Sequence, residues 1–429
     1  MIRKALASAI LVSLLSACGS DKHTVIDNTP VVDQPSEPHP ELELPAGRLA
    51  INSPDSNQVS IYDLTSNQVI DTFSVTNTVS ALYASPNGRY AVAIQRNNNL
   101  VEFIDGGIFL EEHGDHHDLH EDAPSANSFE LLDVKPTHYV PVGEQALVFF
   151  DGDKDASADA GFAIISDESI TESRIVAEHH YETYQHGTGQ IRDGFVLATI
   201  RDVNSETSLP ETIGLFEVHN DHFHQEQTFE HACPDLHGSF QTEDYIAFAC
   251  SDGVVKVKQE GELFTSSKIA NPEELPAGVR IGKFIGSKEN NTIIGLSRGG
   301  VFAVDLTTDE ISPFQWQAEG ITSYLAYGVS GDEESIVVLD EAGYINVFNQ
   351  ESQWQSVARF AAITELDAEK SAKLIANKAN NHVYLAYGNT VYQIDIEHQT
   401  VDEVTTFEDG IGNLTWLGAF EEEEHEHDH

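Results

Sequence analysis

The feature that most constrains this chain is a recurring group of short β-type segments. From about residue 47 onward, an apolar run such as YAVAI, ALVFF, YIAFAC or HVYLAY recurs in units of 41–56 residues. A leading strand precedes each run, a third and a weaker fourth strand follow it, and no amphipathic helix is evident. Four antiparallel strands with a period of roughly 40–50 residues are typical of one β-propeller blade. We therefore predict an all-β chain with a single β-propeller.

The two ends of the repeat region complement each other. Residues 47–73 contain three strands without a leading strand, and residues 413–420 (NLTWLGAF) are a leading strand with no strands after it. Pairing the two ends completes one more blade, closes the ring and removes free sheet edges. We predict about eight four-stranded blades, with seven as the alternative if one unit is misread.

Outside the repeats, the two ends of the chain differ in composition from the predicted propeller. Residues 1–17 carry Arg3 and Lys4 and then an apolar run that ends in the lipobox LSAC, which indicates a bacterial lipoprotein signal peptide with lipidation at Cys18. Residues 18–46 are rich in Pro, Asp, Glu and Ser and are expected to form a flexible tether. Residues 47–420 form the predicted propeller domain, and residues 421–429 form an acidic, His-rich tail. Gly19 and Ser20, and no Asp, follow Cys18 directly. By resemblance to known lipoproteins, this favours a lipid-anchored protein of the periplasm, on the outer membrane.

The net charge indicates which partners are excluded, and the cysteine and methionine content indicates which metal sites are. The formal net charge of −49 makes nucleic acid and anionic lipid surfaces poor partners and attracts divalent cations, although a high-salt habitat would produce the same bias. With Cys18 lipidated, Cys233 and Cys250 remain, and an oxidising compartment favours a disulfide between them over a thiolate metal site. The one methionine is the initiator, which excludes a methionine-lined copper site.

Three histidines occupy the same place in successive blades. His138, His186 and His237 each stand eight or nine residues before the apolar second strand of their blade. The leading strand of a propeller blade lines the central channel, so the three imidazoles are expected to converge at one level. Three neutral imidazoles with an open fourth position match the donor set of a zinc site, although copper or nickel would also bind. The alternative is three histidines that only hydrogen-bond in a polar channel.

A His-rich insertion stands just before the blade led by His138. Residues 105–128 contain EEHGDHHDLH, and we expect this loop to fold over one mouth of the channel. His113, Asp115, His116 or Asp118 would then supply a fourth ligand, with His113 and His116 favoured. Weaker, exchangeable metal binding is expected at the remaining histidines of this loop, at HNDHFH and at the tail: His117, His120, His219, His222, His224, His425, His427 and His429.

Several motifs between about residues 105 and 275 resemble the periplasmic zinc metallochaperone family AztD. They are HGDHHDL, PTHYVP followed by LVFFDG, HGTG, ACPDLHG, FACSDG and KIANP, of which ACPDLHG with the later FAC is the most specific. The resemblance implies a β-propeller that binds zinc and delivers it to the solute-binding protein of a zinc ABC transporter. It also implies that His138, His186 and His237 are zinc ligands together with the HGDH segment.

The sequence therefore predicts a zinc-binding metallochaperone or reservoir of the cell envelope, monomeric and not an enzyme, with Zn²⁺ as its metal. Two alternatives stay open. One is a zinc-dependent propeller hydrolase of the lactonase kind, although no nucleophile motif of the G-x-S-x-G type is found in a strand–turn–helix context. The other is a propeller that presents protein partners without metal.

Overall fold

The computed structural model describes residues 43–113, 116–276, 278–367 and 369–421. Leu44–His429 form one compact unit, and Met1–Glu43 are a separate one. The predicted signal peptide, Cys18, most of the tether, and the tail histidines His425, His427 and His429 lie outside the described residues. Within the described part, no helix is both long and apolar enough to cross a membrane.

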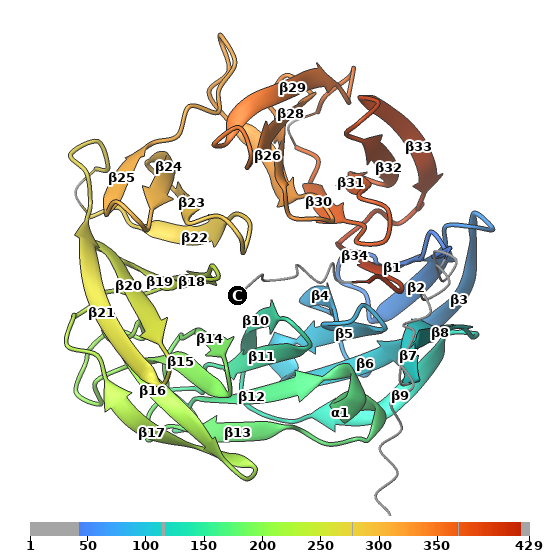
Figure 1. Ribbon diagram of the computed structural model, residues 1–429. Coiled ribbons are helices and arrows are strands. Elements are labelled where there is room, and N and C mark those ends of the chain that lie inside the picture. The colour runs from blue at the N-terminus through green and yellow to red at the C-terminus, as the bar shows by residue number, and fades with distance from the viewer. Residues whose placement is uncertain (1–42, 114–115, 277, 368, 422–429) are drawn as a thin grey trace, which may run out of the picture. The chain divides into compact units, whose positions relative to one another are not determined.

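The described strands form eight blades of four antiparallel strands. Figure 1 shows the blades arranged in a ring. Six blades are separate sheets, and the other two are joined into one eight-stranded sheet by a single parallel bridge between Glu178 and His222. From the inside outward, and in ring order, blades 1 to 8 are β34-β1-β2-β3, β4-β5-β6-β9, β10-β11-β12-β13, β14-β15-β16-β17, β18-β19-β20-β21, β22-β23-β24-β25, β26-β27-β28-β29 and β30-β31-β32-β33. The predicted propeller with eight blades is confirmed.

Each blade contributes one strand to each of four layers. The innermost strands are β34 (Asn413–Leu417), β4 (Ala81–Ala84), β10 (Pro136–Val142), β14 (Gly189–Arg192), β18 (Gly238–Gln241), β22 (Ile281–Ile285), β26 (Tyr324–Val329) and β30 (Ala372–Ala376). The second strands are β1 (Arg48–Asn52), β5 (Tyr90–Gln95), β11 (Gln145–Phe150), β15 (Phe195–Ile200), β19 (Tyr245–Cys250), β23 (Thr292–Ser297), β27 (Ser335–Asp340) and β31 (Val383–Tyr387).

The outer two layers follow in the same order. The third strands are β2 (Gln58–Asp63), β6 (Leu100–Asp105), β12 (Gly161–Ser166), β16 (Thr212–His219), β20 (Gly253–Glu260), β24 (Gly300–Asp305), β28 (Tyr344–Asn349) and β32 (Thr390–Asp395). The outermost strands are β3 (Gln68–Ser74), β9 (Ser125–Leu131), β13 (Ala177–His180), β17 (His222–Thr228), β21 (Leu263–Ala270), β25 (Glu310–Pro313), β29 (Gln355–Ala361) and β33 (Thr400–Thr406).

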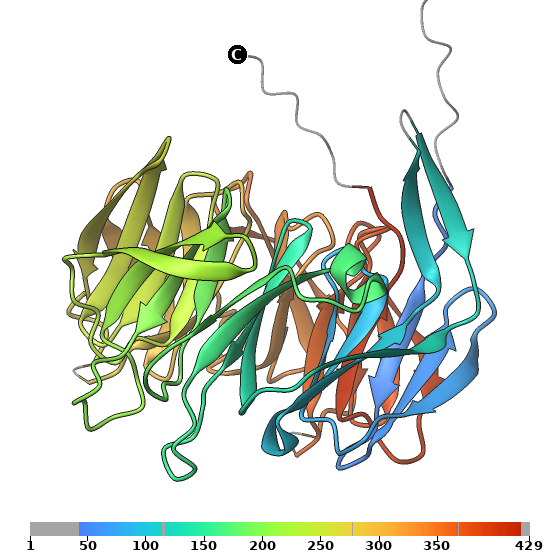
Figure 2. The same ribbon diagram turned by 90° about the horizontal axis from the view of Figure 1, so that it is seen from below.

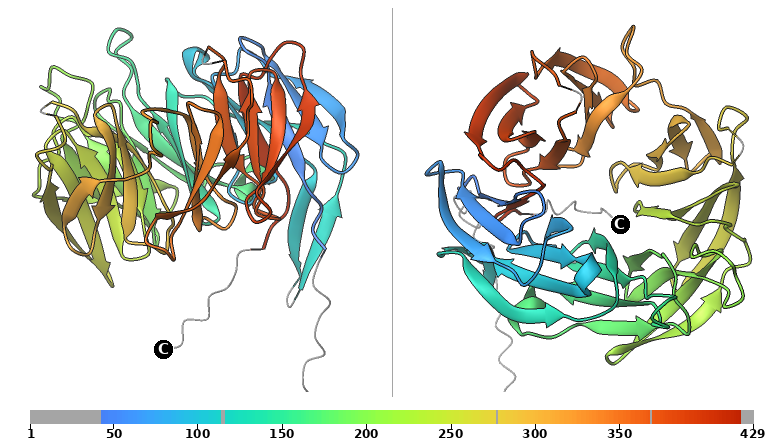
Figure 3. Two further views of the ribbon diagram at one scale, coloured as in Figure 1. Left: turned by 90° about the horizontal axis from the view of Figure 1, so that it is seen from above. Right: turned by 180° about the vertical axis from the view of Figure 1, so that it is seen from behind.

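The ring closes where the two ends of the propeller meet. β34, the last strand, pairs antiparallel with β1, the first, from Arg48 opposite Leu417 to Asn52 opposite Asn413. Figure 3 shows this junction, where the final strand in red lies beside the first strands in blue. A strand from the C-terminus therefore serves as the innermost strand of blade 1, as the incomplete first segment predicts.

The hydrophobic core consists of eight clusters, and each cluster lies between two neighbouring blades. Buried side chains of blades 2 and 3 form one cluster, those of blades 3 and 4 the next, and the series continues around the ring to blades 1 and 2. The second strands contact a neighbouring blade on both of their faces. This explains why YAVAI and YIAFAC are continuous apolar runs rather than alternating ones, because both faces of such a strand are covered.

Four short elements lie between the blade strands. A 3₁₀ turn, η1 (Arg96–Asn98), connects β5 and β6, and a one-turn helix, α1 (Asp167–Thr171), follows β12. The helix begins with a capping box between Ser166 and Ser169, and at five residues it is too short to give a helical period in the sequence. The His-rich insertion between β6 and β9 is a two-stranded hairpin of β7 (Ile108–His113) and β8 (His116–Glu121).

Candidate metal centre

The three histidines in register meet at the start of three successive innermost strands. His138 is the third residue of β10, whereas His186 and His237 stand just before β14 and β18. A glycine follows two of them: a side chain at Gly187 would collide with Phe149 and Thr199, and Gly238 packs against the backbone at Gly282. These glycines let neighbouring blades approach closely at this level, because they add no Cβ at the point of contact.

The ring nitrogens of the three histidines are close enough to share one ion. The Nε2 atom of His186 lies 3.3 Å from Nε2 of His138 and 3.2 Å from Nε2 of His237. All three imidazoles belong to one group whose possible ligand atoms lie within 4.8 Å of one another. Zinc–nitrogen bonds of about 2.0–2.1 Å in a tetrahedral site put nitrogen ligands roughly 3.3–3.4 Å apart. The observed spacing therefore suits a tetrahedral Zn²⁺ with three histidine ligands.

Hydrogen bonds to the far side of two rings fix which nitrogen faces the centre. His186 donates from Nδ1 to Asp151 Oδ2 at 2.9 Å, and His237 donates from Nδ1 to the carbonyl oxygen of Gly282 at 2.9 Å. Because a carboxylate and a carbonyl only accept, the Nδ1 atoms carry protons, and in the neutral form of each ring Nε2 presents a lone pair. Two lone pairs 3.2 Å apart repel each other unless a cation or a proton lies between them.

Asp151 connects the centre to a second layer of polar groups. It lies directly after β11, and its Oδ2 also accepts from an Arg96 guanidinium nitrogen at 2.8 Å. Arg96 in turn donates from Nε to the Thr137 hydroxyl at 2.9 Å, one residue from His138. Burial disfavours the charge of Asp151, but hydrogen bonds from His186, Arg96 and Thr137 outweigh it and lower the pKa of this carboxyl. A carboxylate behind a ligand histidine holds the ring in place and makes its free nitrogen a better donor to metal.

The surroundings favour the neutral form of His138 and His237. Burial, followed by the neighbouring imidazoles of His186 and His237, lowers the pKa of His138 to about 4. Burial is also the largest reason why the pKa of His237 is lowered. Since only the neutral imidazole offers a lone pair to a metal, these shifts favour metal binding at neutral pH.

The centre opens into the channel. His138 and His237 line one end of a cavity of ≈ 1260 Å³, which extends along the innermost strands of blades 3 to 6 toward Gly143, Glu243 and Lys288. A metal ion held by the three histidines would therefore have its remaining coordination position accessible from this cavity. An open position is the feature that separates exchangeable or reactive zinc sites from closed structural ones.

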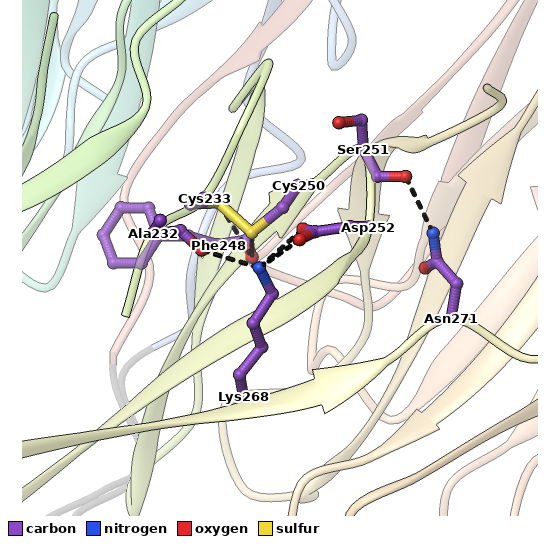
Figure 4. Close-up of a disulfide and its surroundings, with 8 residues drawn as sticks. All are labelled: Ala232, Cys233, Phe248, Cys250, Ser251, Asp252, Lys268 and Asn271. Atoms are coloured by element: carbon purple, nitrogen blue, oxygen red, sulfur yellow. Dashed lines mark hydrogen bonds and ion pairs between the residues drawn. A yellow bond between two sulfur atoms is a disulfide. The ribbon is translucent and has the colours of Figure 1, made fainter. Parts of the chain in front are cut away.

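The predicted disulfide between Cys233 and Cys250 is present and lies close to the centre in sequence. It joins the segment before β18, which carries His237 four residues later, to the end of β19. Figure 4 shows that Lys268 of β21 braces the same junction, donating to the Ala232 carbonyl and to the Asp252 carboxylate at 2.6 Å each. Both cysteines are fully buried, and the bond between them ties the segment that carries His237 to β19 of the same blade.

The predicted lid over the channel is wrong. β6 runs parallel to β4, the innermost strand of its blade. The last residue of β6, Asp105, pairs with Tyr90, and the last residue of β4, Ala84, pairs with Ala91, so the two strands end at the same level. The hairpin therefore leaves from the face where the innermost strands end, whereas the three histidines lie where those strands begin. Figures 1 and 2 show β7 and β8 at the outer edge of the ring, projecting away from it. The sequence predicted an insertion correctly, but the strand order directs it away from the centre.

The hairpin has its own group of polar contacts. One face carries His113, His116 and His120 together with Glu111 and Asp118. The Nε2 atom of His113 lies 3.6 Å from Glu111 and 3.7 Å from Asp118, and that of His120 lies 2.9 Å from Glu111. Asp115 lies outside the described residues, and His117 belongs to the opposite face of the hairpin. Metal binding by this hairpin remains a prediction separate from the channel centre.

Sequence reasoning missed the residues that orient the three histidines. Asp151 is part of the motif LVFFDG, but its role depends on lying beside the next blade, which the sequence does not show. Arg96 comes from blade 2 and the carbonyl of Gly282 from blade 6. The one available signal was that Asp151 ends an apolar second strand in the blade led by His138.

The fold and the centre together define a class of protein: an eight-bladed β-propeller with three histidines gathered in its channel as candidate metal donors. No family model matches the chain.

Comparison with known proteins points to one particular relative. The zinc chaperone AztD of Citrobacter koseri is 27% identical over 254 residues, which cover 59% of this chain and 58% of that protein, so the alignment spans little more than half the relative's length. Two solved structures of AztD from Citrobacter koseri match with TM-scores of 0.69 and 0.71 at 20% and 21% identity, covering 87% of this chain and 98% and 99% of theirs. The resemblance to AztD that the motifs predict is thus confirmed.

A more distant solved structure shares the fold alone. The dihydro-heme d1 dehydrogenase NirN, in complex with DHE, matches with a TM-score of 0.54 at 11% identity, covering 90% of this chain and 78% of that one.

Proposed function

We propose that this protein is a zinc-binding chaperone that holds Zn²⁺ on His138, His186 and His237 in the propeller channel. The observation that carries the proposal is the convergence of three Nε2 atoms from three blades, two of them with the lone pair turned inward by a hydrogen bond at Nδ1. The similarity to a protein named as a zinc chaperone supports the same conclusion, and it favours metal binding over catalysis.

Capture and release follow from the donor set. The formal net charge of −49 draws divalent cations toward the chain, and three neutral imidazoles hold Zn²⁺ without adding charge. The position open toward the cavity admits a donor from a second protein, so that zinc is passed on by ligand exchange rather than released into water. By its resemblance to AztD, the recipient is the solute-binding protein of a zinc ABC transporter.

The proposed location is the periplasm, with a lipid at Cys18 anchoring the chain, by its flanking residues, to the outer membrane. Fractionation of cells that express the Cys18→Ser variant tests this. We expect the wild-type protein in the membrane fraction and the variant outside it, and equal membrane association of both would overturn the anchor.

Metal analysis of the mature protein tests the site. We expect one tightly bound Zn²⁺ per chain in the wild type and none in the variant with His138, His186 and His237 all replaced by alanine. The matched control is His398→Ala, which removes an exposed histidine that pairs with Asp395 far from the channel. Full stoichiometry and unchanged affinity in the triple variant would show that zinc binds elsewhere.

Transfer is tested with the zinc-loaded protein and an apo solute-binding protein, mixed in the presence of a chelator that competes for free zinc. Direct exchange predicts that the recipient gains zinc faster than the chelator does. If the recipient fills only at the rate at which zinc reaches the chelator, the protein is a reservoir and not a chaperone. Turnover of esters or lactones by the zinc-loaded protein would instead favour a hydrolase.

A further inference from the structure

A second group of metal donors lies on the outer part of blade 4, away from the channel strands. It combines Glu217 and His219 of β16 with Glu226 of β17, and the possible ligand atoms of the three lie within 4.8 Å of one another. Within the described residues, the channel centre is the other group that meets this criterion. From this group we infer a second, surface-exposed site for Zn²⁺ or a similar divalent transition-metal ion.

The antiparallel register places these side chains on one face. Glu217 and His219 are two residues apart on β16, so they point to the same side of the sheet, whereas Val218 between them pairs with the buried Phe223 on the other side. Glu217 lies directly opposite His224, whose ring packs edge-on against His219 with centroids 5.0 Å apart. His222, opposite His219, belongs to the same face, but its Nδ1 contacts Asp221 at 2.7 Å. The face therefore offers the imidazoles of His219 and His224 and the carboxylate of Glu217 before Glu226 is considered.

A β-bulge brings in the second carboxylate. The ladder between β16 and β17 shifts between Leu215 and Phe216, which pair with Gln227 and Gln225, so Glu226 has no partner in the ladder. Oε1 of Glu226 lies 3.8 Å from Nε2 of His219. Oε2 of Glu217 lies 3.7 Å from the same nitrogen. Bulges commonly re-aim a side chain in this way.

The distances fit a cation better than hydrogen bonds. At 3.7 and 3.8 Å both carboxylates are beyond hydrogen-bond range of His219, and the two negative charges repel each other. A Zn²⁺ ion with bonds of about 2.0–2.2 Å would draw these donors together by a few tenths of an ångström and neutralise both charges. His224 is the adjacent fourth donor, which completes an imidazole and carboxylate set that zinc accepts.

Exposure sets the character of this site. The side chains of His219, Glu217 and Glu226 are about half exposed, at 52%, 46% and 46%. Unlike the channel histidines, they must lose side-chain freedom when a metal binds, which weakens affinity and speeds exchange. The site therefore binds metal more weakly than the channel centre and is suited to fast uptake at the surface. It does not depend on the channel centre.

Histidine modification by diethyl pyrocarbonate, mapped by mass spectrometry, tests the site individually. The mature protein is first loaded with one equivalent of zinc, and modification is then compared with and without additional ZnCl₂. We expect zinc to reduce modification of His219 and His224 several-fold, and to leave the exposed His398 unchanged as an internal control. Equal modification of His219 at all zinc concentrations would overturn the inference.

Two variants make the test specific. Glu217→Gln combined with Glu226→Gln keeps both histidines and the size of the side chains, and we expect it to abolish the protection of His219 while the tight channel zinc remains. Glu260→Gln, an exposed carboxylate on blade 5, is the matched control and keeps the protection. Protection that survives in the double variant would show that zinc on other surface donors, and not this site, shields His219.

The channel variant separates this inference from the proposed function. Replacing His138, His186 and His237 by alanine removes the tight zinc but should leave the protection of His219 intact. Loss of the protection in that variant would overturn the independence of the surface site. If the triple-alanine variant keeps both the tight zinc and the protection of His219, the channel proposal is contradicted and the surface site is not.

Discussion

Asp151 belongs to the same blade as His138, but it accepts hydrogen bonds from residues of the two neighbouring blades. It accepts from Nδ1 of His186 and from Arg96, and so connects blades 2, 3 and 4 at the level of the three histidines. An ionised carboxylate fixes both the orientation of the His186 ring and the nitrogen that faces the centre. We therefore expect this residue to control metal affinity through His186.

Replacing this carboxylate should weaken zinc binding without unfolding the protein. In Asp151→Asn the amide can offer either its oxygen or its NH₂ group to His186, and it cannot stabilise the charge that develops on a metal-bound imidazole. We expect zinc affinity to fall about 10–100-fold, the usual effect of losing such a partner, as measured by chelator competition. Asp153→Asn is the control, since its carboxylate pairs with Lys135 at the surface. Equal affinities in wild type and Asp151→Asn would exclude the positioning role.

The histidines also make the metal-free protein sensitive to acid. In the folded chain the pKa of His138 is lowered to about 4 and that of His237 is also lowered, chiefly by burial, while in the unfolded chain both titrate near the ordinary 6.5. The unfolded state thus binds more protons as pH falls below about 6.5, so stability is lost from there down to about pH 4. His186, His237, Arg96 and Asp151 are the charged or titratable groups that act on the pKa of His138, and of these Asp151 alone opposes the lowering.

Urea unfolding of the metal-free protein at pH 7.5 and pH 5 measures this loss. We expect the midpoint to fall with pH in the wild type and to fall less in His138→Asn, which has no imidazole to protonate at that position. His398 acts in the opposite sense, because Asp395 raises its pKa, so its contribution to stability is present at low pH and is lost as pH rises. A wild-type midpoint that is constant or higher at pH 5 would contradict the prediction.

At the scale of elements, the metal centre depends on how the innermost strands begin. Each of the three histidines stands at or just before the first residues of such a strand, where the chain arrives from the previous blade. Such a junction has fewer ladder hydrogen bonds than a strand interior and needs other restraints. For His186 these are Asp151 and the close packing at Gly187, and for His237 they are the Gly282 carbonyl and the disulfide.

Removing the disulfide should affect stability and zinc binding together. The bond between Cys233 and Cys250 closes a loop with a sequence separation of 17, and such a crosslink contributes about 3 kcal/mol by restricting the unfolded chain. We expect the double variant Cys233→Ala/Cys250→Ala to unfold at lower denaturant concentration and to bind zinc more weakly, because His237 follows four residues after Cys233. Reducing agent should weaken the wild type and leave the double variant unchanged. A variant with reduced stability but full zinc affinity would show that the disulfide does not position His237.

At the scale of the whole molecule, the ring is held together by the eight clusters between neighbouring blades. The clusters on the two sides of blade 1 both include residues from β1 and from β34, the two ends of the propeller. The one between blades 8 and 1 contains Leu49 and Ile51 of β1 and Leu414 and Trp416 of β34. The indole of Trp416 also donates to the carbonyl of Ala46 at 3.0 Å. The junction thus closes the ring through packing as well as through the strand ladder.

Truncating Trp416 should destabilise the whole propeller. It is 3% exposed, and Trp416→Ala leaves a large cavity at the closure, for which we expect a loss of about 3–5 kcal/mol in the free energy of unfolding. Leu132→Ala, at a side chain 75% exposed, is the control and should change stability by less than about 0.5 kcal/mol. Thermal denaturation followed by circular dichroism compares the two. Similar small effects of both substitutions would mean that the closure does not limit stability.

Much of this architecture was predictable because the determining patterns are local and repeat. Apolar second strands buried on both faces mark each blade, and their period gives the number of blades once the incomplete segment 47–73 is joined to NLTWLGAF. The same repeat put His138, His186 and His237 at equivalent positions, and a closed ring turns equivalent positions into spatial neighbours.

Two features of the protein were decided by the tertiary structure alone. They are the contacts between neighbouring blades and the face of the ring from which the hairpin between β6 and β9 leaves. The role of Asp151 requires blades 2, 3 and 4 side by side, and the carbonyl of Gly282 comes from blade 6. Composition made the hairpin 108–121 look like part of the channel site, yet the direction of β6 sends it to the opposite face. Sequence alone determines which residues recur at each blade position, because side-chain burial imposes that pattern locally. The partners that meet across blades depend on strand direction and ring packing, which no single repeat contains.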